Sequence, residues 1–214
     1  MFFDAVLIDE FQDFRESDYE VIIRLAKLLT NVILVGDYNQ HSVSGLNNAG
    51  KPFKKGKSYI SFSAFVEVIR KAGFEVDTKT LSKSRRCSAE VCDYISQKLG
   101  IDIMSTNDHI GKVIWADSIA NEVLRNNDIT KLVYSDASKY SFPALNWSYS
   151  KGDTLACACV ILTKDFENLA EEDFSVNGLA VSTLNKLYVA MTRSRSDLFL
   201  IKQSTFRKLR DLYL

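Results

Sequence analysis

The sequence predicts an α/β protein built on a parallel sheet, and the first 36 residues carry this prediction. Residues 5–8 and 32–35 are short apolar runs, typical of parallel strands buried between helices. Between them, apolar side chains recur at helical spacing. Strand, helix and strand in succession form a βαβ unit, whose right-handed crossover makes the two strands parallel.

The helix of this unit is expected to begin at a capping box, Ser17-Asp18-Tyr19-Glu20, and to end near Thr30-Asn31. Its apolar stripe comprises Val21, Ile22, Leu25, Leu28 and Leu29.

Further elements follow along the chain. A helix is expected over residues 60–72, with Phe62, Phe65, Val66 and Ile69 inward and Gly73 as its stop. A strand over 76–81 precedes a helix that opens near Ser88 and buries Val91, Tyr94, Ile95 and Leu99. Short strands surround a helix near 117–127. A strand at 157–162, a helix at 180–194, a strand at 198–201 and a short basic helix complete the prediction.

Composition indicates an ordinary globular protein. The 214 residues suffice for one large domain or two small ones. Lys+Arg and Asp+Glu are both 27, which excludes a uniformly basic nucleic-acid binder but permits a local basic groove. With neither a membrane-length apolar run nor a signal-peptide pattern, the expected location is cytoplasmic and not in a membrane. The cysteines at 87, 92, 157 and 159 are expected as buried reduced thiols, with a four-Cys metal site as the less favoured alternative.

Polar residues follow both strands of the βαβ unit. Asp9, Glu10, Gln12 and Asp13 follow the first strand, and the segment Gly36-Asp37-Tyr38-Asn39-Gln40 follows the second. Because carboxyl ends of parallel strands meet at one edge, this edge is a candidate ligand crevice. Adjacent acids there suit a hydrated Mg²⁺, with one carboxylate holding the ion and the other acting as a base. The alternative is a strand that ends in a solvated acidic loop.

A stretch that imitates a phosphate-binding loop lies at residues 45–58. Residues 45–51 match the first seven positions of a Walker A motif, but Pro52 replaces the hydroxyl residue that ligands Mg²⁺. Residues 56–58 match the end of the motif, but Lys51 stands where its first glycine belongs. Neither match joins a predicted strand to a helix, so this is expected to be a basic loop and the chain has no Walker A motif of its own.

Five segments in order resemble motifs II to VI of UvrD-like superfamily 1 DNA helicases. They are Asp9-Glu10-Phe11-Gln12-Asp13 (the Walker B motif), Gly36-Asp37-Tyr38-Asn39-Gln40, Leu81-Ser82-Lys83-Ser84-Arg85-Arg86-Cys87-Ser88, Ser150-Lys151-Gly152 and Leu187-Tyr188-Val189-Ala190-Met191-Thr192-Arg193. The chain is similar to the C-terminal portion of these enzymes. The resemblance implies a RecA-like P-loop NTPase architecture, with residues 1–75 as part of a first motor domain and 76–214 as the second.

The resemblance also implies roles for residues in an ATP-hydrolysing site. Asp9 would hold Mg²⁺ through water, Glu10 would orient and deprotonate the attacking water, and Gln40 would sense the γ-phosphate. Arg86 and Arg193 would act as arginine fingers, although each alone also fits a surface salt bridge. Nucleotide-binding residues would be Gln12, Asp13, Asp37, Arg85, Lys151 and Gly152.

Three departures from the family pattern bear on these roles. Arg85 replaces the tyrosine that stacks on adenine in the family. After Ser-Lys-Gly the family has an apolar residue and then a carboxylate, whereas this chain has Asp153 and Thr154. The Walker A lysine, the adenine-reading glutamine segment and the early DNA-contact motifs are absent. A sheet that lacks the Walker A strand has an unpaired apolar edge, which a partner or another segment must cover.

These observations lead to two main hypotheses on function. The first is a helicase fragment or subunit that contributes Walker B, sensor and arginine-finger residues to an ATP-driven DNA motor, with a partner chain for the Walker A half. The isolated chain would then lack ATPase activity and bind single-stranded DNA weakly, through basic residues and aromatics such as Trp147 or Tyr149. Both aromatics also fit an ordinary core or sheet face.

The second hypothesis is a catalytically inactive helicase-like module that binds or regulates a protein or nucleic acid. An unrelated nucleotidase or nuclease that uses Asp9, Glu10 and Asp13 is a third possibility, but it would not explain the ordered motifs or the arginines.

Overall fold

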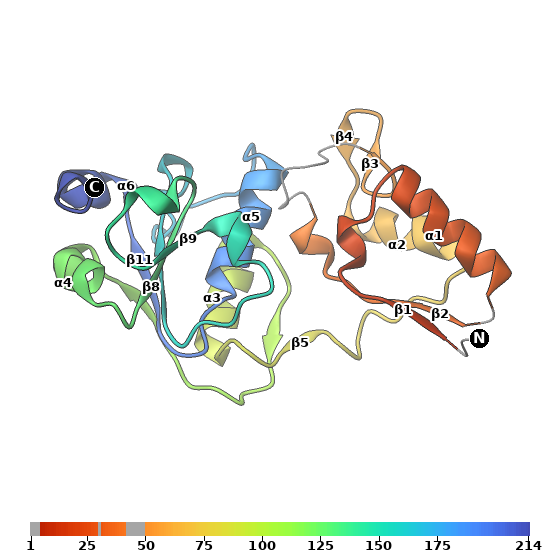
Figure 1. Ribbon diagram of the computed structural model, residues 1–214, viewed down its shortest axis with the longest axis horizontal. Coiled ribbons are helices and arrows are strands. Elements are labelled where there is room, and N and C mark those ends of the chain that lie inside the picture. Colours follow the sequence, from red (N-terminus) through yellow and green to blue (C-terminus); the bar gives the residue numbers. More distant parts are fainter. Residues whose placement is uncertain (1–4, 30, 42–49) are drawn as a thin grey trace. The chain divides into compact units, whose positions relative to one another are not determined.

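The chain divides into two compact units, Met1–Thr78 and Lys79–Leu214 (Figure 1). The computed structural model describes residues 5–29, 31–41 and 50–214. Both units are mixed α/β structures with parallel strands, so the predicted fold class is confirmed. That the units correspond to two motor domains stays a prediction.

Unit 1 contains the predicted βαβ unit. Strands β1 (Val6–Ile8) and β2 (Val32–Leu34) run parallel, and α1 (Ser17–Leu28) connects them. Each strand leads into a short 3₁₀ helix, η1 (Phe11–Asp13) after β1 and η2 (Tyr38–Gln40) after β2. The prediction of strand, helix and strand is therefore confirmed, with boundaries within about two residues of those expected.

The rest of unit 1 packs against this βαβ unit. A hairpin of β3 (Lys54–Lys55) and β4 (Ser58–Tyr59) precedes α2 (Phe62–Lys71). The Ser61 hydroxyl caps α2 by accepting the Ala64 N–H at 3.3 Å. Phe11, Tyr19, Ile22 and Ile69 form a small core, against which Ile8, Leu34 and Phe65 pack.

Helix α1 begins at Ser17 as predicted, but the predicted capping box and part of the predicted inner face are wrong. Ser17 is the first helical residue, and its predecessor Glu16, at φ 48°, makes no side-chain cap. Helix α1 buries Tyr19 and Ile22, whereas Val21 is 55% exposed and Leu28 81% exposed. The apolar stripe therefore leaves part of its surface outside the core. In α2, Phe62 is likewise 49% exposed, in contrast to Val66 and Ile69.

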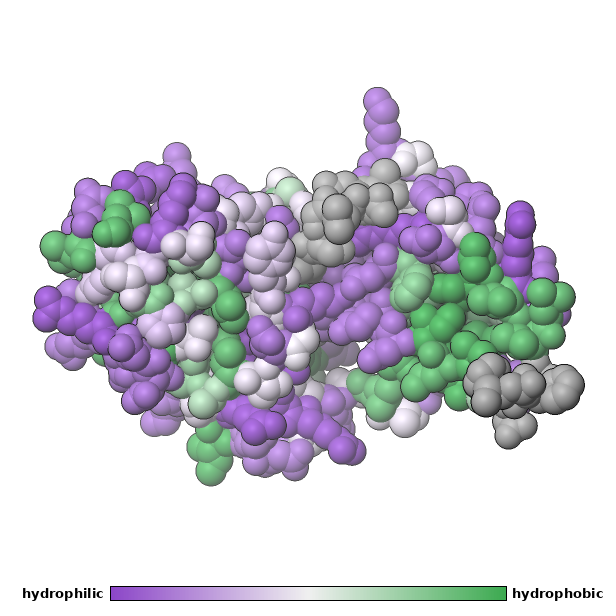
Figure 2. Space-filling view, viewed as in Figure 1, coloured by the Kyte–Doolittle hydropathy of each residue, from purple (hydrophilic) through white to green (hydrophobic). Residues whose placement is uncertain are grey.

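One face of the β1–β2 sheet is open in unit 1. Leu7 and Ile33 are register partners and are 64% and 52% exposed, although both strands were expected to be buried. On the other face, Ile8 and Leu34 pack on the core. Figure 2 shows apolar side chains gathered over the part of unit 1 that β1, β2 and α1 form. The apolar sequence of these strands reflects two apolar faces, only one of which this unit covers.

The predicted strand over 76–81 is also wrong. Val76 packs against the core of unit 1, but residues 77–81 are exposed, and residues 78–81 form bends and turns. A single buried apolar residue supplies too little packing to hold a strand in place. The first strand of unit 2 is instead β5 (Lys83–Ser84), which pairs parallel with β6 (Met104–Ser105).

Unit 2 is built on a five-stranded parallel sheet. Its strand order is β7 (Val113–Trp115), β11 (Leu198–Ile201), β10 (Ala158–Ile161), β8 (Thr130–Val133) and β9 (Ala144–Asn146). The helices are α3 (Ala89–Leu99), α4 (Ala120–Arg125), α5 (Val181–Met191) and α6 (Gln203–Leu209). Short 3₁₀ helices are η3 (Asp117–Ile119), η4 (Ala137–Lys139), η5 (Trp147–Ser150), η6 (Lys164–Phe166) and η7 (Arg210–Leu212). The parallel sheet flanked by helices is consistent with a RecA-like architecture.

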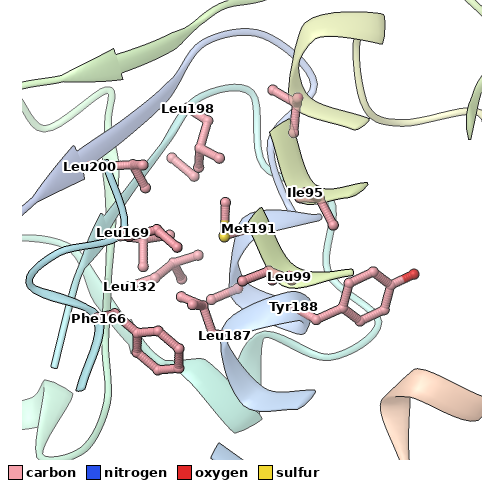
Figure 3. Packing of buried hydrophobic residues seen from close by; sticks show 14 of the residues in the cluster. Ile95, Leu99, Leu132, Phe166, Leu169, Leu187, Tyr188, Met191, Leu198 and Leu200 are labelled. Atoms are coloured by element: carbon pink, nitrogen blue, oxygen red, sulfur yellow. The ribbon is translucent and has the colours of Figure 1, made fainter. Parts of the chain in front are cut away.

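Helices cover both faces of this sheet, which explains its continuous apolar strands. In β10, Val160 belongs to the core cluster that includes α3 and α5, whereas Cys159 and Ile161 belong to the cluster that includes α4 and α6. Figure 3 shows Ile95 and Leu99 of α3 and Met191 of α5 packed with Leu198 and Leu200 of β11.

The structure also bears on the predictions for the cysteines and for membrane-spanning segments. All four cysteines are free thiols, and Cys157 and Cys159 lie on the same side of the sheet. The described residues contain no group of three or more His, Cys, Asp and Glu side chains that could hold a metal ion. A search of the same part of the chain finds no helix with the length and apolar character of a membrane span.

Candidate functional site

The carboxyl ends of β1 and β2 lie side by side, as the sequence predicts. The Val35 N–H donates to the Ile8 carbonyl at 2.9 Å, and the Phe11 N–H donates to the Val35 carbonyl at 2.9 Å. These bonds extend the pairing beyond the strands, so the acidic segment after β1 and the polar segment after β2 share one edge of the sheet.

Gln12 joins the two segments. Its side-chain amide donates to the Glu10 carboxylate, and its Oε1 accepts the Asp37 N–H at 3.0 Å. Gln12 is 1% exposed, and a Cβ at Gly36 would approach its Oε1 to 2.5 Å. Any side chain at residue 36 would therefore require the bridging Gln12 amide to shift.

Asp9 and Glu10 form a tight turn at the end of β1. Glu10 has φ 53°, in the left-handed region, and its N–H donates to Asp9 Oδ1 at 2.8 Å. Asp9 is exposed and Glu10 is half-buried. The two carboxylates are thus fixed differently, Asp9 by its neighbour's backbone and Glu10 by the Gln12 side chain.

Asp37 organises the segment after β2. Its Oδ1 accepts the Asn39 N–H at 2.9 Å, which caps η2, and its Oδ2 accepts the Gln40 side-chain amide at 3.0 Å. Gln40 is therefore held through Asp37, whose own N–H bonds to Gln12. Glu10, Gln12, Asp37 and Gln40 form one connected hydrogen-bond network.

Asp13 belongs to the buried side of this edge. It lies in η1 beside Arg15, which is 3% exposed and has its guanidinium carbon 5.8 Å from the centre of the Phe53 ring. Burial lowers the pKa of Arg15, while Tyr59 and then Asp13 oppose this change. Asp13 thus stabilises a buried cation, and its geometry supports a structural role.

The carboxylates of this edge suit Mg²⁺ held together with phosphates. Mg²⁺ is commonly held by one or two carboxylates, several waters and phosphate oxygens, which does not require a three-acid cage. Asp9 supplies hard oxygen ligands of this type at an exposed position, and the half-buried Glu10 follows it directly. Among the described residues, Asp9, Glu10 and Asp13 are not gathered into one group that could hold a metal ion.

In unit 2, Arg86 lies at the amino ends of two sheet strands. Its Nε donates to Thr154 Oγ1 at 2.8 Å, and its Nη1 donates to the Thr192 carbonyl at 3.1 Å. The segments that precede β10 and β11 are joined there by a bridge between Leu155 and Ser194. A pocket of about 320 Å³ lies beside Arg86, and its lining residues are Ser84, Arg85, Arg86, Thr154 and Arg195.

Arg193 is embedded in the chain. It is 2% exposed, and its nitrogens donate to the Val189 carbonyl at 2.8 Å, to Thr192 Oγ1 at 2.9 Å and to the Asp153 carbonyl at 3.4 Å. It therefore ties the end of α5 to the turn at residues 150–154. This placement differs from the exposed setting that a mobile arginine finger requires.

Lys151 and Gly152 lie in the same turn. The Asp153 N–H donates to the Ser150 carbonyl at 3.1 Å, and Gly152 adopts φ 86°. This turn presents the Asp153 carbonyl to Arg193 and the Thr154 hydroxyl to Arg86. The structure thus brings Arg86, Arg193, Lys151 and Gly152 together within unit 2, while Arg85 is exposed at the pocket.

Arg86 and Arg193 also act on the Cys87 thiol. The pKa of Cys87 is lowered to about 7, first by a hydrogen bond with Cys92, and also by Ser84 and the two arginine charges, against burial. The pKa of Cys92 is raised, first by the same hydrogen bond and then by burial. A thiol buried to 1% exposure thus lies in the positive field of both arginines.

The sequence missed Arg195, and of the two alternatives for Trp147 the core position is the correct one. Arg195 lines the pocket, and its only sequence signal is its position two residues after Arg193. Trp147 is fully buried and donates to the Leu132 carbonyl at 3.0 Å, so the expectation that it could stack on DNA is wrong. Tyr149 is 75% exposed and remains available for such contacts.

The stretch that imitates a phosphate loop does not open a helix where it is described. Residues 45–49 lie outside the described residues, and residues 51–53 form a turn that leads into the β3–β4 hairpin. Gly56 lies in that hairpin at φ 63°, and Ser58 begins β4. A Walker A motif requires a helix N-terminus after its lysine, which neither match has.

Comparisons with known proteins point to helicases. The family model for the UvrD/REP helicase N-terminal domain matches residues 2–49. No curated protein matches the chain. Among solved structures, the crystal structure of PRRSV nsp10 (helicase) matches with 15% identity and a TM-score of 0.35, over 98% of this chain and 38% of that one.

The crystal structure of methylated PRRSV nsp10 (helicase) gives 16% identity, a TM-score of 0.35 and coverage of 94% and 36%. The chain thus spans little more than a third of these helicases, and TM-scores this low do not establish a shared fold. The match over residues 2–49 includes both polar segments that follow β1 and β2 up to Gln40. Over these residues, the chain is similar to the N-terminal domain of the UvrD/REP helicases.

Proposed function

We propose that this chain contributes the Walker B, sensor and arginine residues of an ATP-driven, UvrD-like DNA motor, and that residues outside this sequence supply the Walker A half. The observation that carries the proposal is the network of Glu10, Gln12, Asp37 and Gln40, which joins the ends of two parallel strands. The network lies within the segment that matches the helicase family model.

Each residue of unit 1 has a distinct part in this proposal. Bound ATP and Mg²⁺ would supply the phosphoryl group and neutralise its charge. Asp9 contributes an exposed carboxylate that can ligand the ion directly or through water. Glu10, oriented by Gln12, can accept a proton from a water molecule beside it. Gln40 can exchange its bond to Asp37 for a phosphate oxygen and thereby report the nucleotide state.

The arginines of unit 2 support different roles. Arg86 uses two of its five N–H groups for Thr154 and Thr192, which leaves donors for a phosphate. Arg193 acts as a positioning residue, since its bonds hold the 150–154 turn that carries Lys151, Gly152 and Thr154. We propose that Gln12 and Asp37 position Glu10 and Gln40, and that Asp13 stabilises Arg15, in place of direct contact with the nucleotide.

The open face of the β1–β2 sheet supports the proposal that residues outside this sequence complete the motor domain. Leu7 and Ile33 are adjacent, apolar and exposed on a sheet of only two strands in the described part of unit 1. Exposed apolar faces and unpaired strand edges favour association with more structure. We propose the Walker A half of a motor domain as the occupant, because its strand would extend this parallel sheet and bring a phosphate cradle to the edge that holds Asp9 and Glu10.

Single-stranded DNA is the proposed nucleic-acid partner. The chain has zero net charge, so contact must come from local basic groups and from exposed aromatics such as Tyr149. We expect weak binding of an oligothymidylate that falls at least tenfold between 50 and 200 mM salt, roughly the effect of several phosphate contacts. Fluorescence anisotropy measures this. Affinity that does not depend on salt, or the lack of binding, contradicts the proposal.

Complementation tests the motor function. The chain is mixed or co-expressed with the polypeptide of a neighbouring reading frame that encodes a Walker A half, and ATPase activity is measured with and without single-stranded DNA. We expect no turnover from the chain alone and DNA-stimulated turnover from the complex. The Glu10→Gln variant should lower kcat on the order of 100-fold or more, as expected for loss of a general base.

The matched control is Glu20→Gln, which removes an exposed carboxylate on α1 and should leave turnover unchanged. Turnover by the chain alone that Glu10→Gln abolishes contradicts the need for a supplied Walker A half. Turnover by the complex that Glu10→Gln does not affect contradicts the assigned site.

A second candidate function is an inactive helicase-like module that binds a partner. The burial of Arg193, together with Thr154 where a nucleotide-contacting carboxylate is expected, favours it. This module would form a stable complex with the Walker A polypeptide or with a helicase, and the ATPase activity of that complex would be the same with Glu10→Gln. The complementation experiment therefore distinguishes the two functions.

A further inference from the structure

Unit 2 contains a cationic pocket that the roles above use only in part. Its lining residues are Ser84, Arg85, Arg86, Thr154 and Arg195, which together provide three guanidinium groups and two hydroxyls and include no carboxylate. Arg85 and Arg195 are exposed, and Arg86 is half-buried. Three positive side chains without an acidic neighbour in the lining favour an anionic ligand with more than one charged group.

Arg86 is fixed in this pocket before any ligand binds. Bonds to Thr154 Oγ1 at 2.8 Å and to the Thr192 carbonyl at 3.1 Å hold the plane of its guanidinium. A planar donor that is already oriented loses less entropy when it binds a phosphate. Thr154 thus acts through Arg86, and a carboxylate at this position would instead neutralise it.

Arg195 projects from a backbone that the sheet holds next to Thr154. Its N–H donates to the Leu155 carbonyl at 2.9 Å, and the Ser196 N–H donates to the Ala156 carbonyl at 3.1 Å. The chains that lead into β10 and β11 are therefore paired at this point, and Arg195 is one residue beyond the bridge between Leu155 and Ser194. The pairing places a second arginine beside Arg86 in a defined position.

Arg193 has the opposite setting. It is 2% exposed, it does not line the pocket, and its nitrogens donate to Val189, Thr192 and Asp153. To reach a ligand, it would have to break bonds that hold the end of α5. Arg195 reaches the pocket without such a cost.

We infer that this pocket binds the phosphate chain of a nucleoside polyphosphate, and that Arg195, not Arg193, is the second arginine that contacts it. A volume of about 320 Å³ is at the small end of the range for ligand pockets, which suits a phosphate chain better than a whole nucleotide. The inference rests on the proposed function only in its choice of a nucleotide as the source of the phosphates.

Calorimetric titration of the full chain with inorganic tripolyphosphate tests the inference without hydrolysis. Arg195→Gln and Arg86→Gln should each weaken binding by about tenfold, roughly the effect of one or two charge-assisted hydrogen bonds. Arg207→Gln, an exposed arginine of α6 in the same unit, makes the same change in net charge and should leave the affinity unchanged. Arg195→Lys should give an intermediate loss, because it keeps the charge but not the planar fork.

Thermal unfolding of each variant accompanies the titration. Arg195→Gln should unfold like the parent chain, while Arg193→Gln should unfold at a lower temperature, because Arg193 holds the turn at residues 150–154. If Arg86→Gln is also unstable, Arg85→Gln replaces it as the second test of the pocket.

Three results would overturn the inference: no binding of tripolyphosphate by the parent chain, equal binding by Arg195→Gln and Arg207→Gln, or a larger effect of Arg195→Gln on oligothymidylate than on tripolyphosphate. The last result would make the pocket a contact for a nucleic-acid backbone. If the complementation experiment gives no ATPase activity but the chain still binds tripolyphosphate, the proposed motor function is wrong and the inference on the pocket is unaffected. The two experiments therefore test the two proposals separately.

Discussion

At the scale of single residues, Gln12 and Gly36 act as a pair. Gln12 bridges Glu10 and the Asp37 N–H, and it packs where a Cβ on residue 36 would lie 2.5 Å from its Oε1. The short segment after β2 is therefore shaped by a side chain of the segment after β1. Neither residue explains the geometry alone.

Gly36→Ala should destabilise unit 1 by about 1–3 kcal/mol, since the added methyl must displace the buried amide. Urea unfolding followed by circular dichroism measures this. In a Gln12→Ala background the same substitution should cost less, because the clash with Oε1 is gone. Equal costs in both backgrounds would show that Gly36 is required by the backbone of Phe11 and Gln12 instead, whose nitrogens lie 3.1 and 3.3 Å from the same Cβ position.

Cys159 should make the unfolding free energy of unit 2 fall as the pH rises in the alkaline range. The thiol is fully buried, and burial raises its pKa above the ordinary value. The unfolded thiol ionises near pH 8.5 while the folded thiol stays protonated. The stability from this group is thus fully present below about pH 8.5 and is lost as the pH rises above it, at about 1.4 kcal/mol per pH unit.

The prediction is a steeper loss of unfolding free energy between pH 8 and 10 for the parent chain than for Cys159→Ala, which lacks the ionisable group. The variant should be less stable at pH 8, because it leaves a cavity in the core. Parallel pH profiles for the two proteins would show that other groups, such as Cys157, whose pKa burial also raises, account for the dependence.

At the scale of elements, β1 and β2 have one covered and one open face. Ile33 is 52% exposed, whereas its neighbour Leu34 packs on the core of unit 1. In the isolated chain, Ile33→Thr should change the unfolding free energy by less than about 0.5 kcal/mol, as for an ordinary surface position. Leu34→Thr should cost more, since it removes core contacts and buries a hydroxyl.

The affinity for the Walker A polypeptide should depend more on Ile33 than on Leu34, the reverse of the order expected for the unfolding free energy. Ile33→Thr should weaken association, because it places a hydroxyl on the face that the polypeptide covers. Pull-down and titration of the complex measure this effect. Unchanged association with Ile33→Thr and Leu7→Thr would exclude the open face as the interface.

At the scale of the whole molecule, the two units have separate cores. The residues of the core of unit 1 lie between Ile8 and Val76, and both clusters of unit 2 lie between Cys87 and Tyr213. The core of unit 1 is much smaller, and small cores give low stability. The units are therefore expected to unfold as separate cooperative steps, unit 1 first.

A polypeptide of residues 79–214 should fold alone and unfold at the same denaturant concentration as the second transition of the full chain. Near-ultraviolet circular dichroism, through buried Trp147, reports the packing of this unit. A single transition for the full chain, or an unfolded 79–214 polypeptide, would show that the units depend on each other.

The sequence predicted where most helices and strands lie in the chain, but it predicted less well which of their side chains face the core. The strands at β10 and β11 and the helices at α3 and α5 were predicted within about three residues because their apolar periods are clear. The outward turn of Val21 and Leu28, and the missing strand at 76–81, were not predicted. Both depend on how much neighbouring structure exists to bury an apolar side chain, which local pattern does not reveal.

For the site, residue order predicted the shared edge of Asp9, Glu10 and Gln40, because parallel strands must end together. It did not distinguish Arg193 from Arg195, since two arginines two residues apart carry the same charge and differ only in burial and hydrogen bonding. Trp147 was ambiguous for the same reason, because an indole suits both a core and a stacking surface.

By itself, the sequence determined the α/β class, the parallel strands, the acidic segment at the end of β1 and the similarity of residues 2–49 to helicases, since these depend on residue type and order. Only the tertiary structure decided which arginine reaches the pocket, how Gln12 links Glu10 to Asp37, and which sheet face is open. Those properties depend on distances between residues far apart in the chain, and packing alone sets these distances.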